Sequence, residues 1–172
     1  ILQKNDTSIY MVFPRIIKPN DMPRSLILLE KMKAGRLKGV VAGNLGLLSE
    51  AVNLGFDVIA DFSLNIFNSI SLRILRKLGT QRTILSPELT LKQISALTDE
   101  VDKEVIVHGR LPLMISEHDI RDFSGSGKLQ AVGIKDRIGK IFPVKFDENN
   151  RTHIYNTDVL CMINHLNSIK QV

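Results

Sequence analysis

The sequence predicts an α/β protein in which a parallel sheet is followed by a short antiparallel β segment and a C-terminal helix. Two observations support this fold class. Through the first two thirds of the chain, short apolar runs alternate with helical patterns, which is typical of βα units. Further on, short strand patterns are separated by turn-forming residues rather than by helices, which is typical of antiparallel hairpins.

Five short runs rich in β-branched residues predict the parallel strands: Ser8–Phe13, Lys38–Ala42, Phe56–Ala60, Arg82–Leu85 and Glu104–His108. Helical spacing of apolar residues predicts the connecting helices: Pro23–Ala34, Leu45–Leu54, Asn65–Leu78 and Leu91–Asp99. Glycine follows each of the first three helices, and Thr90 precedes the fourth as an N-cap. In the helix over Asn65–Leu78, a single apolar stripe is expected along one face: Ile66, Ile70, Ile74 and Leu78.

The pattern changes after residue 116. Ser124–Gly127 is expected to be a flexible loop, and three antiparallel strands are predicted beyond it, at Leu129–Lys135, Lys140–Phe146 and Thr152–Asn156. Asp136–Gly139 and Asp147–Asn150 supply the turns between them. Thr157 is expected to cap a last helix that runs to Ile169 and buries four apolar side chains: Val159, Leu160, Ile163 and Leu166. Cys161 would then be a small core residue of that helix.

Composition limits the class of protein. The chain has 172 residues, about one domain in length, and its 44% hydrophobic content suits a globular core. The net charge of +5 comes from Lys and Arg that are scattered along the chain, which does not indicate a nucleic-acid-binding face. The single Cys161 excludes an internal disulfide and an all-cysteine metal site within this chain, and favours a cytoplasmic location.

The ends of the chain and its longest apolar runs also carry information. No run reaches the roughly 20 residues that span a bilayer, and no signal peptide opens the sequence, so no membrane partner is expected. The chain begins at Ile1 and enters a strand pattern almost at once, so we expect it to be a piece of a longer protein. Five parallel strands are too few for a closed (β/α)₈ barrel. An open doubly wound sheet and the later part of a barrel both fit the periodicity.

Polar side chains close every predicted parallel strand. Arg15 and Asn44 end the first two strands. Strand alternation after Phe56 places three polar residues on one face: Asp61, Ser63 and Asn65. In the same way Ser86 and Glu88 share a face after the fourth strand, and His108 and Arg110 after the fifth. Because ligands bind at the C-terminal ends of strands in such folds, we expect this rim to hold the site.

The residue types at this rim suggest chemistry. Asp61, Glu88 and His108 are candidate ligands for a divalent metal, or candidate general acids and bases. Alternatively, Arg110 neutralises Asp61 or Glu88 in a structural charge network. We therefore assign catalytic roles to these four residues, and substrate binding to five others: Arg15, Asn44, Ser63, Asn65 and Ser86.

Several long strings in the sequence resemble a known family. They are GNLGLLSEAVNLG (Gly43–Gly55), ADFSLNIFNS (Ala60–Ser69), LSPELTL (Leu85–Leu91), VHGRLPLMIS (Val107–Ser116) and DRIGKIFPV (Asp136–Val144). Together they are similar, in this order, to the collagenase-like peptidases of family U32, from about Tyr10 to about Leu166. The resemblance implies a peptidase-family protein and carries six functional positions over to this chain, without assigning a nucleophile: Asp61, Ser63, Asn65, Glu88, His108 and Arg110.

The resemblance also implies a fold. Residues 1–116 would be the later βα units of a TIM-type barrel, residues 117–128 a flexible connection, and residues 129–172 a β extension with a closing helix. The missing N-terminal part of the same protein, or another copy, would complete the barrel. The substrate would be a peptide or an RNA.

Other relatives in the family resemble oxygen-independent hydroxylation factors, which act on RNA or a quinone precursor with an iron–sulfur cluster held by four cysteines. The corresponding stretches here are Ser116–Asp119 and Glu148–Arg151, and neither contains cysteine. One cysteine cannot hold such a cluster, so we expect none in this chain. Three functions therefore remain: a peptidase-family fragment with its site at the strand ends, a hydroxylation-type factor that has lost its cluster, and a non-catalytic scaffold.

Overall fold

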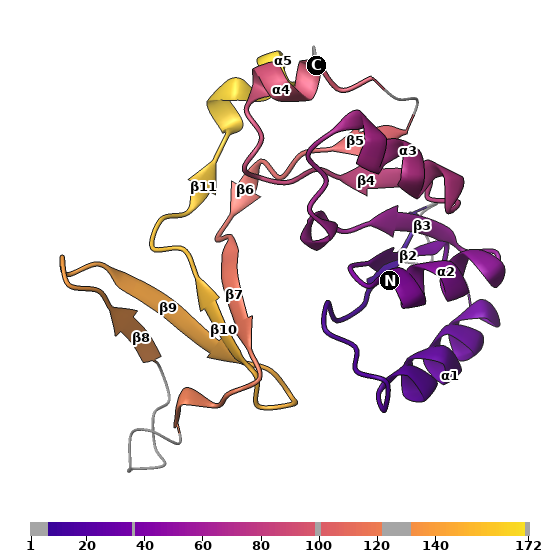
Figure 1. Ribbon diagram of the computed structural model, residues 1–172, viewed down its shortest axis with the longest axis horizontal. Coiled ribbons are helices and arrows are strands. Elements are labelled where there is room, and N and C mark those ends of the chain that lie inside the picture. Colours follow the sequence, from indigo (N-terminus) through magenta and orange to yellow (C-terminus); the bar gives the residue numbers. More distant parts are fainter. Residues whose placement is uncertain (1–6, 36, 99–100, 122–131, 171–172) are drawn as a thin grey trace. The chain divides into compact units, whose positions relative to one another are not determined.

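The computed structural model describes residues 7–35, 37–98, 101–121 and 132–170 (Figure 1). The chain forms two compact units, Ile1–Ile106 with Ser168–Val172 and Val107–Asn167. The predicted Ser124–Gly127 loop, the end of the helix predicted to reach Asp99 and the start of the strand predicted from Leu129 lie outside the described residues. Among the described helices, none is both long enough and apolar enough to cross a membrane.

The first unit contains a parallel sheet, as predicted. Its strands are β1 (Tyr10–Val12), β2 (Gly39–Ala42), β3 (Asp57–Ala60), β4 (Arg82–Ile84) and β5 (Asp102–Glu104). Its helices are α1 (Met22–Lys33), α2 (Leu45–Asn53), the 3₁₀ turn η2 (Phe62–Leu64), α3 (Ser69–Lys77) and α4 (Leu91–Ser95). The five strands are hydrogen-bonded in chain order, β1-β2-β3-β4-β5, and every pair is parallel. A doubly wound sheet reverses its strand order at a switch point, and this sheet contains no such reversal.

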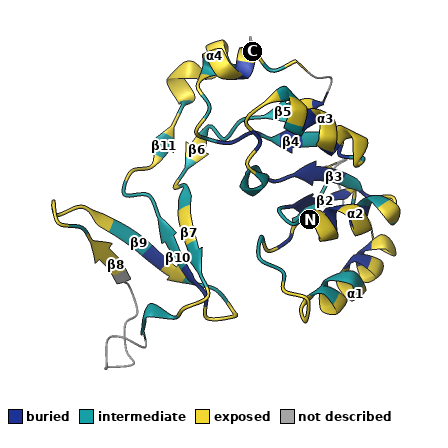
Figure 2. Ribbon diagram, viewed as in Figure 1, coloured by how far each residue is buried: buried dark blue, intermediate teal, exposed yellow. Residues whose placement is uncertain are grey.

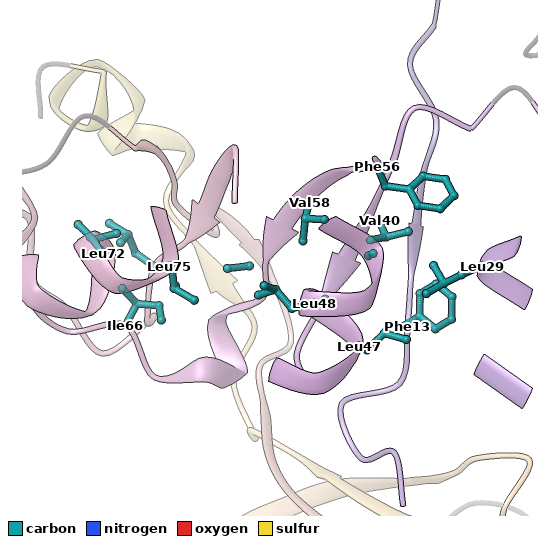
Figure 3. Close-up of a cluster of buried hydrophobic side chains, with 14 of the residues drawn as sticks. Phe13, Leu29, Val40, Leu47, Leu48, Phe56, Val58, Ile66, Leu72 and Leu75 are labelled. Carbon is teal, nitrogen blue, oxygen red and sulfur yellow. The ribbon is translucent and has the colours of Figure 1, made fainter. Parts of the chain in front are cut away.

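The helices pack on one face of this sheet. Val40, Ala42, Val58 and Ala60 are fully buried and alternate along β2 and β3, so they share a face. They form a single core with buried residues from all four helices, among them Leu29, Leu48 and Leu72, which Figure 3 shows, and Ile94 of α4. Figure 2 shows β2 and β3 buried, while α1, α2 and α3 expose part of their surface.

Local signals in the sequence explain where the helices begin and end. The side chain of Asn44 accepts a hydrogen bond from the Leu47 N–H and so caps α2. Thr90 and Gln93 form a complete capping box at α4, as the sequence predicted for Thr90. Gly55 and Gly79, which follow α2 and α3, have positive φ angles of 84° and 95°, a conformation that favours glycine.

Three predictions for the first unit are wrong. The predicted Asn65–Leu78 helix begins only at Ser69, because Asp61 caps a separate 3₁₀ turn before it. Helix α3 buries Leu72 and Leu75, so Ile70 and Ile74 of the predicted stripe are 67% and 53% exposed. The fifth parallel strand ends at Glu104, so His108 does not close it.

The second unit is an antiparallel β structure. Its strands are β6 (His108–Gly109), β7 (Pro112–Ser116), β8 (Val132–Lys135), β9 (Ile141–Phe146), β10 (Thr152–Tyr155) and β11 (Leu160–Cys161). The three predicted antiparallel strands are confirmed as β8, β9 and β10. Strand β7 was not predicted as a separate element and pairs with β10, completing a four-stranded sheet of order β7-β10-β9-β8. Strands β6 and β11 form a second ribbon.

The predicted last helix is wrong over most of its length. Its first part is strand β11, followed by the 3₁₀ turn η4 (Ile163–His165) and the short helix α5 (Leu166–Ile169). Val159, Ile163 and Leu166, expected in the core, are exposed. Cys161 is also exposed rather than buried, because it lies on β11, directly opposite His108 in the two-stranded ribbon.

Candidate functional site

Four residues meet at the C-terminal ends of β1, β2 and β3. The backbone ladder continues past the strands: the Phe13 N–H donates to the Val41 carbonyl, and the Asp61 N–H donates to the Ala42 carbonyl. This places Arg15, after β1, and Asp61, after β3, on either side of Gly43, which follows β2. Arg15 Nε lies 3.1 Å from Asp61 Oδ2, and Ser63 lies over the same glycine.

Gly43 is what allows this close approach. A methyl group on its Cα would lie 2.4 Å from Ser63 Oγ, 3.2 Å from Arg15 Cγ and 3.3 Å from Asp61 Oδ2. The first distance is far inside van der Waals contact. Any larger residue at position 43 would therefore displace the side chains of the rim.

Asp61 is a buried carboxylate, with 8% of the residue exposed. Its Oδ2 also accepts a hydrogen bond of 3.2 Å from the Ser63 N–H, which caps η2. A buried charge needs a partner of opposite sign, and Arg15 supplies it. From the sequence, Arg110 was an alternative partner for Asp61 or Glu88. Arg110 lies in the second unit, where it donates to the backbone carbonyls of Asn156, at 2.8 Å, and Thr157, and its pairing with either carboxylate stays a prediction.

Arg15 is held on one edge and on one face. Its guanidinium carbon lies 4.1 Å from the centre of the Phe62 ring, a cation–π contact. Its Nε faces Asp61, and its side chain is 27% exposed. Within the part of the chain that the structure describes, Asp61 and Phe62 are its only side-chain partners.

The other rim candidates of the first unit have structural contacts of their own. The Asn44 amide oxygen caps α2, and Asn65 closes η2 in the left-handed conformation with φ of 54°. Ser86 is buried, and its Oγ accepts a bond of 3.4 Å from the Glu88 N–H. The Glu88 side chain itself is exposed. The Ser86 N–H donates to the Ile66 carbonyl at 3.4 Å, which ties the loop after β4 to the loop after β3.

His108 and Arg110 belong to the second unit, so their convergence with Asp61 and Glu88 stays a prediction. Among the described residues, no group of at least three His, Cys, Asp or Glu side chains is arranged to hold a metal ion. The 172 residues also do not supply the four thiolates that an iron–sulfur cluster requires, because Cys161 is the single cysteine.

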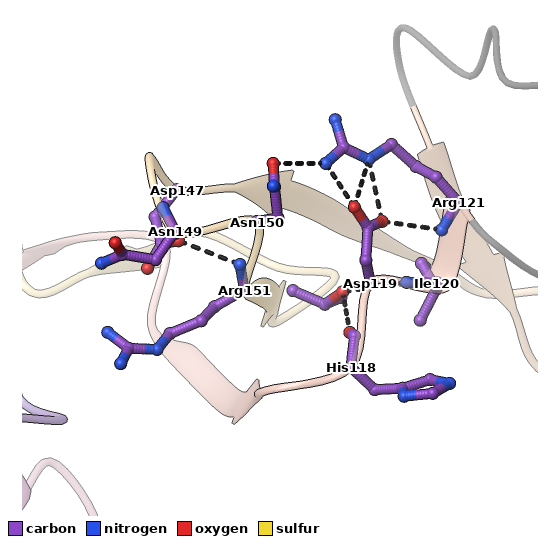
Figure 4. Close-up of polar contacts among 9 residues, drawn as sticks. His118, Asp119, Ile120, Arg121, Asp147, Asn149, Asn150 and Arg151 are labelled. Carbon is purple, nitrogen blue, oxygen red and sulfur yellow. Dashed lines mark hydrogen bonds and ion pairs between the residues drawn. The ribbon is translucent and has the colours of Figure 1, made fainter. Parts of the chain in front are cut away.

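The second unit has its own polar cluster, around the turn between β9 and β10 (Figure 4). Arg121 forms an ion pair with Asp119, and this bond to the Arg121 side chain lowers the pKa of the Asp119 carboxyl. Burial acts to raise the pKa of Asp147. The His153 side chain and the backbone N–H groups of Arg151 and Asn149 donate to its carboxylate and outweigh burial, so the net pKa is lowered.

These charges serve the turn that the sequence predicted at Asp147–Asn150. Arg151 is buried, and its Nε donates to Glu117 Oε1 at 2.6 Å. Thr152 is fully buried and donates to the His118 carbonyl at 2.6 Å. The cluster thus joins the end of β7 to the start of β10, and we assign it a structural role.

Sequence reasoning missed two contributors to the rim. Gly43 was not among the expected rim residues, because the close contact with Ser63 that requires glycine depends on the pairing of β2 with β3. Phe62 was not among the rim residues expected from strand alternation. That alternation ends at Ala60, because residues 62–64 form a 3₁₀ turn with about three residues per turn. No local signal in the sequence indicated its contact with Arg15.

The first unit is a parallel α/β sheet with polar side chains at the C-terminal ends of its strands, the edge at which ligands bind in such folds. The family model for peptidase family U32 matches residues 1–121. The chain therefore belongs to peptidase family U32, which confirms the resemblance seen in the sequence.

Among curated proteins, the chain is similar to an uncharacterized protease of Methanocaldococcus jannaschii. The two are 29% identical over 119 residues, a stretch that covers 65% of this chain and 29% of the relative. This chain thus matches less than a third of the length of that protein. The search of solved structures gave no significant match.

Proposed function

We propose that this chain is part of a peptide-bond hydrolase whose site lies at the C-terminal ends of β1, β2 and β3. One observation carries the proposal: a buried carboxylate, Asp61, is fixed beside Arg15 over Gly43 at the rim of a chain of peptidase family U32. Arranging buried charge is expensive in free energy, and such arrangements are concentrated at active sites.

Asp61 has the atoms to act as a general base. Its Oδ2 is engaged by Arg15 and by the Ser63 N–H, whereas its Oδ1 has no partner among the described residues. In the proposed reaction, Oδ1 accepts a proton from water while the water oxygen bonds to the peptide carbonyl carbon. The C–N bond then breaks, and the departing amine takes up the proton. Glu88, exposed beyond the neighbouring strand, is the proposed relay: its carboxylate takes this proton from Asp61 and passes it to the amine, so that both carboxylates end the cycle ionised.

The same sheet supports a barrel of the TIM type. Chain-order parallel strands with helices on one face are the layout of a (β/α)₈ barrel, and the curated relative is longer than this chain. Strands β1 and β5 are open edges of the described sheet, and an unpaired edge is a template for another strand. We propose that further strands of the same protein, or of a second copy, complete the barrel there.

The test compares two ion-paired aspartates, Asp57, the first residue of β3, and Asp61, the residue that follows β3. Asp61 and Asp57 lie at opposite ends of β3, and each is ion-paired, Asp57 with Lys38 at 3.7 Å. Full-length protein is incubated with gelatin and with internally quenched peptides. Asp61→Asn is expected to reduce kcat/KM about 10²–10⁴-fold, the usual contribution of a general base. Asp57→Asn is expected to leave kcat/KM unchanged.

Circular dichroism establishes that each variant is folded. Glu88→Gln provides a second variant at an exposed position, where folding is not at risk, and it is expected to lower the rate as well. Absence of cleavage by the folded wild-type protein, or equal rates for wild type and Asp61→Asn, would overturn the proposal.

A further inference from the structure

We propose that Arg15 is a carboxylate-binding residue, so that the substrate of this site is a peptide bearing a carboxylate next to the bond that is cleaved. The statement that the bound peptide is a substrate rests on the proposed function. The binding itself rests only on the surroundings of Arg15. Neither the family match nor the curated relative assigns a role to this residue.

The surroundings of the guanidinium leave one edge for a ligand. One face lies against the Phe62 ring at 4.1 Å, and the Nε side lies against Asp61 at 3.1 Å. The remaining edge, formed by the two terminal nitrogens, has no partner among the described residues. Two parallel N–H groups on this edge match the two oxygens of a carboxylate.

Asp61 makes this edge more selective. By engaging Nε, and with Phe62 fixing the plane, it positions the guanidinium before a ligand arrives, which reduces the entropy lost on binding. The same carboxylate repels a second negative charge, and a phosphate dianion would be repelled more strongly than a carboxylate. The site therefore favours a planar monoanion over phosphate.

The exposure of Arg15 fits a binding role. Its side chain is 27% exposed, so the charge is partly desolvated but its open edge can be reached. Partial desolvation strengthens a charge-assisted hydrogen bond. A free α-carboxylate and an acidic side chain offer the same chemistry, and the experiment separates these two sources.

Binding is measured without cleavage. Full-length protein with ¹⁵N-labelled arginine is titrated with four probes: N-acetyl-dialanine, its C-terminal amide, the amide of N-acetyl-alanyl-glutamate, and inorganic phosphate. We expect N-acetyl-dialanine or the glutamate peptide to shift the Arg15 Nε–H resonance and to bind at least about tenfold more tightly than the dialanine amide. The tighter of these two probes identifies the source of the carboxylate.

Arg82 supplies a matched control in the same sheet. It is also ion-paired, with Glu104 at 2.7 Å, lies over Tyr10 at 5.0 Å, and has a side chain that is 34% exposed. Arg15→Lys keeps the charge but removes the two-pronged edge, and is expected to weaken carboxylate binding about tenfold. Arg82→Lys is expected to have no effect. Phe62→Leu, which keeps Arg15 and removes the stacked ring, is expected to cause a smaller loss.

The outcomes distinguish this inference from the proposed function. Equal affinity for carboxylate and amide probes, equal losses in Arg15→Lys and Arg82→Lys, or phosphate binding as tight as carboxylate would overturn the inference. Selective carboxylate binding without cleavage of any peptide would support it and refute the hydrolase. Equal cleavage of peptides with and without the carboxylate would refute this inference and leave the proposed hydrolase standing.

Discussion

Gly43→Ala tests the geometry of the rim through stability alone. Gly43 does not have a positive φ, so the backbone tolerates alanine, and restricting the unfolded chain stabilises the protein by about 0.4–1 kcal/mol. Against this, the new methyl group would lie 2.4 Å from Ser63 Oγ. Overpacking of this kind costs about 1–3 kcal/mol. We expect a net loss of about 1 kcal/mol in the free energy of unfolding, with packing outweighing chain entropy.

Ser63→Ala removes the atom responsible. Ser63 Oγ is buried without a hydrogen-bond partner, so its removal is expected to stabilise the protein by about 1 kcal/mol. With alanine at position 63, the nearest atoms to the new methyl group are Arg15 Cγ and Asp61 Oδ2, at 3.2 and 3.3 Å. The loss caused by Gly43→Ala should then nearly vanish.

The coupling between positions 43 and 63 is measured on four proteins: wild type, Gly43→Ala, Ser63→Ala and the double variant. Each is unfolded with urea and followed by far-UV circular dichroism. We expect the coupling to be about 1 kcal/mol, above the roughly 0.3–0.5 kcal/mol typical of independent sites. Additive effects, with Gly43→Ala equally costly in both backgrounds, would show that Ser63 does not lie over Gly43 and would refute the geometry of the rim.

Two further predictions concern helix packing and pH. Leu72 is fully buried on α3, whereas Ile74 is 53% exposed. Leu72→Ala should therefore lower the free energy of unfolding by about 3 kcal/mol, and Ile74→Ala by less than about 1 kcal/mol, as measured by urea unfolding. Equal losses would show that the isoleucine face of α3 is packed, as the sequence suggested. The lowered pKa of Asp147 means that its carboxylate stabilises the fold above its ordinary pKa of 3.8, and that this contribution is lost as the pH falls through and below that value. Asp147→Asn should therefore lower stability by about 0.5 kcal/mol near pH 7, a modest figure because the pair is partly screened by solvent, and by progressively less as the pH falls below 3.8. A loss independent of pH would contradict the assigned charge effect.

The parallel half of the fold was predictable because its signals are local. The run Lys38–Ala42 is apolar after its first residue, as a strand buried on both faces must be, and β2 is buried at every position. Thr90 and Gln93 are three residues apart and form a capping box. Such signals depend only on residues close together in the sequence, and the strand and the helix cap that they predicted are present in the structure.

Elements fixed by distant pairing were not predictable. The apolar residues after Thr157 resemble a helix, yet Leu160 and Cys161 pair with Gly109 and His108, about fifty positions earlier. In α3, a four-residue spacing of isoleucines suggested the packed face, but the buried leucines, Leu72 and Leu75, decided which side meets the sheet. Hydrophobic spacing identifies a helix better than it identifies the face that packs.

The candidate site was predictable in position but not in its contacts. Placing polar residues at strand ends identified Arg15, Asp61 and Ser63, since the C-terminal ends of parallel strands share one edge. Arg15 was expected only to bind substrate, and Arg110 was the alternative ion-pair partner considered for Asp61 or Glu88, because sequence order gives no measure of which arginine lies close to a carboxylate. The order of strands decides this: β1 and β3 flank β2, and the glycine at its end leaves room for Arg15.

The two polar clusters differ in a way that bears on function. Around the β9–β10 turn, Asp147 accepts from His153 and from backbone N–H groups, and buried Arg151 is paired with Glu117, so the charges hold the turn. At the rim, by contrast, one edge of Arg15 and one oxygen of Asp61 remain open among the described residues, and the Ser63 hydroxyl is buried without a partner. Folding alone favours satisfied polar groups, because an unsatisfied one lowers stability. The Ser63 hydroxyl is one such group, and so are the hydroxyls of Thr80 and Thr83, which precede and lie in β4, so this feature does not set the rim apart. The difference between the two clusters is the open edge of Arg15 and the open oxygen of Asp61, which leave the rim able to bind a ligand.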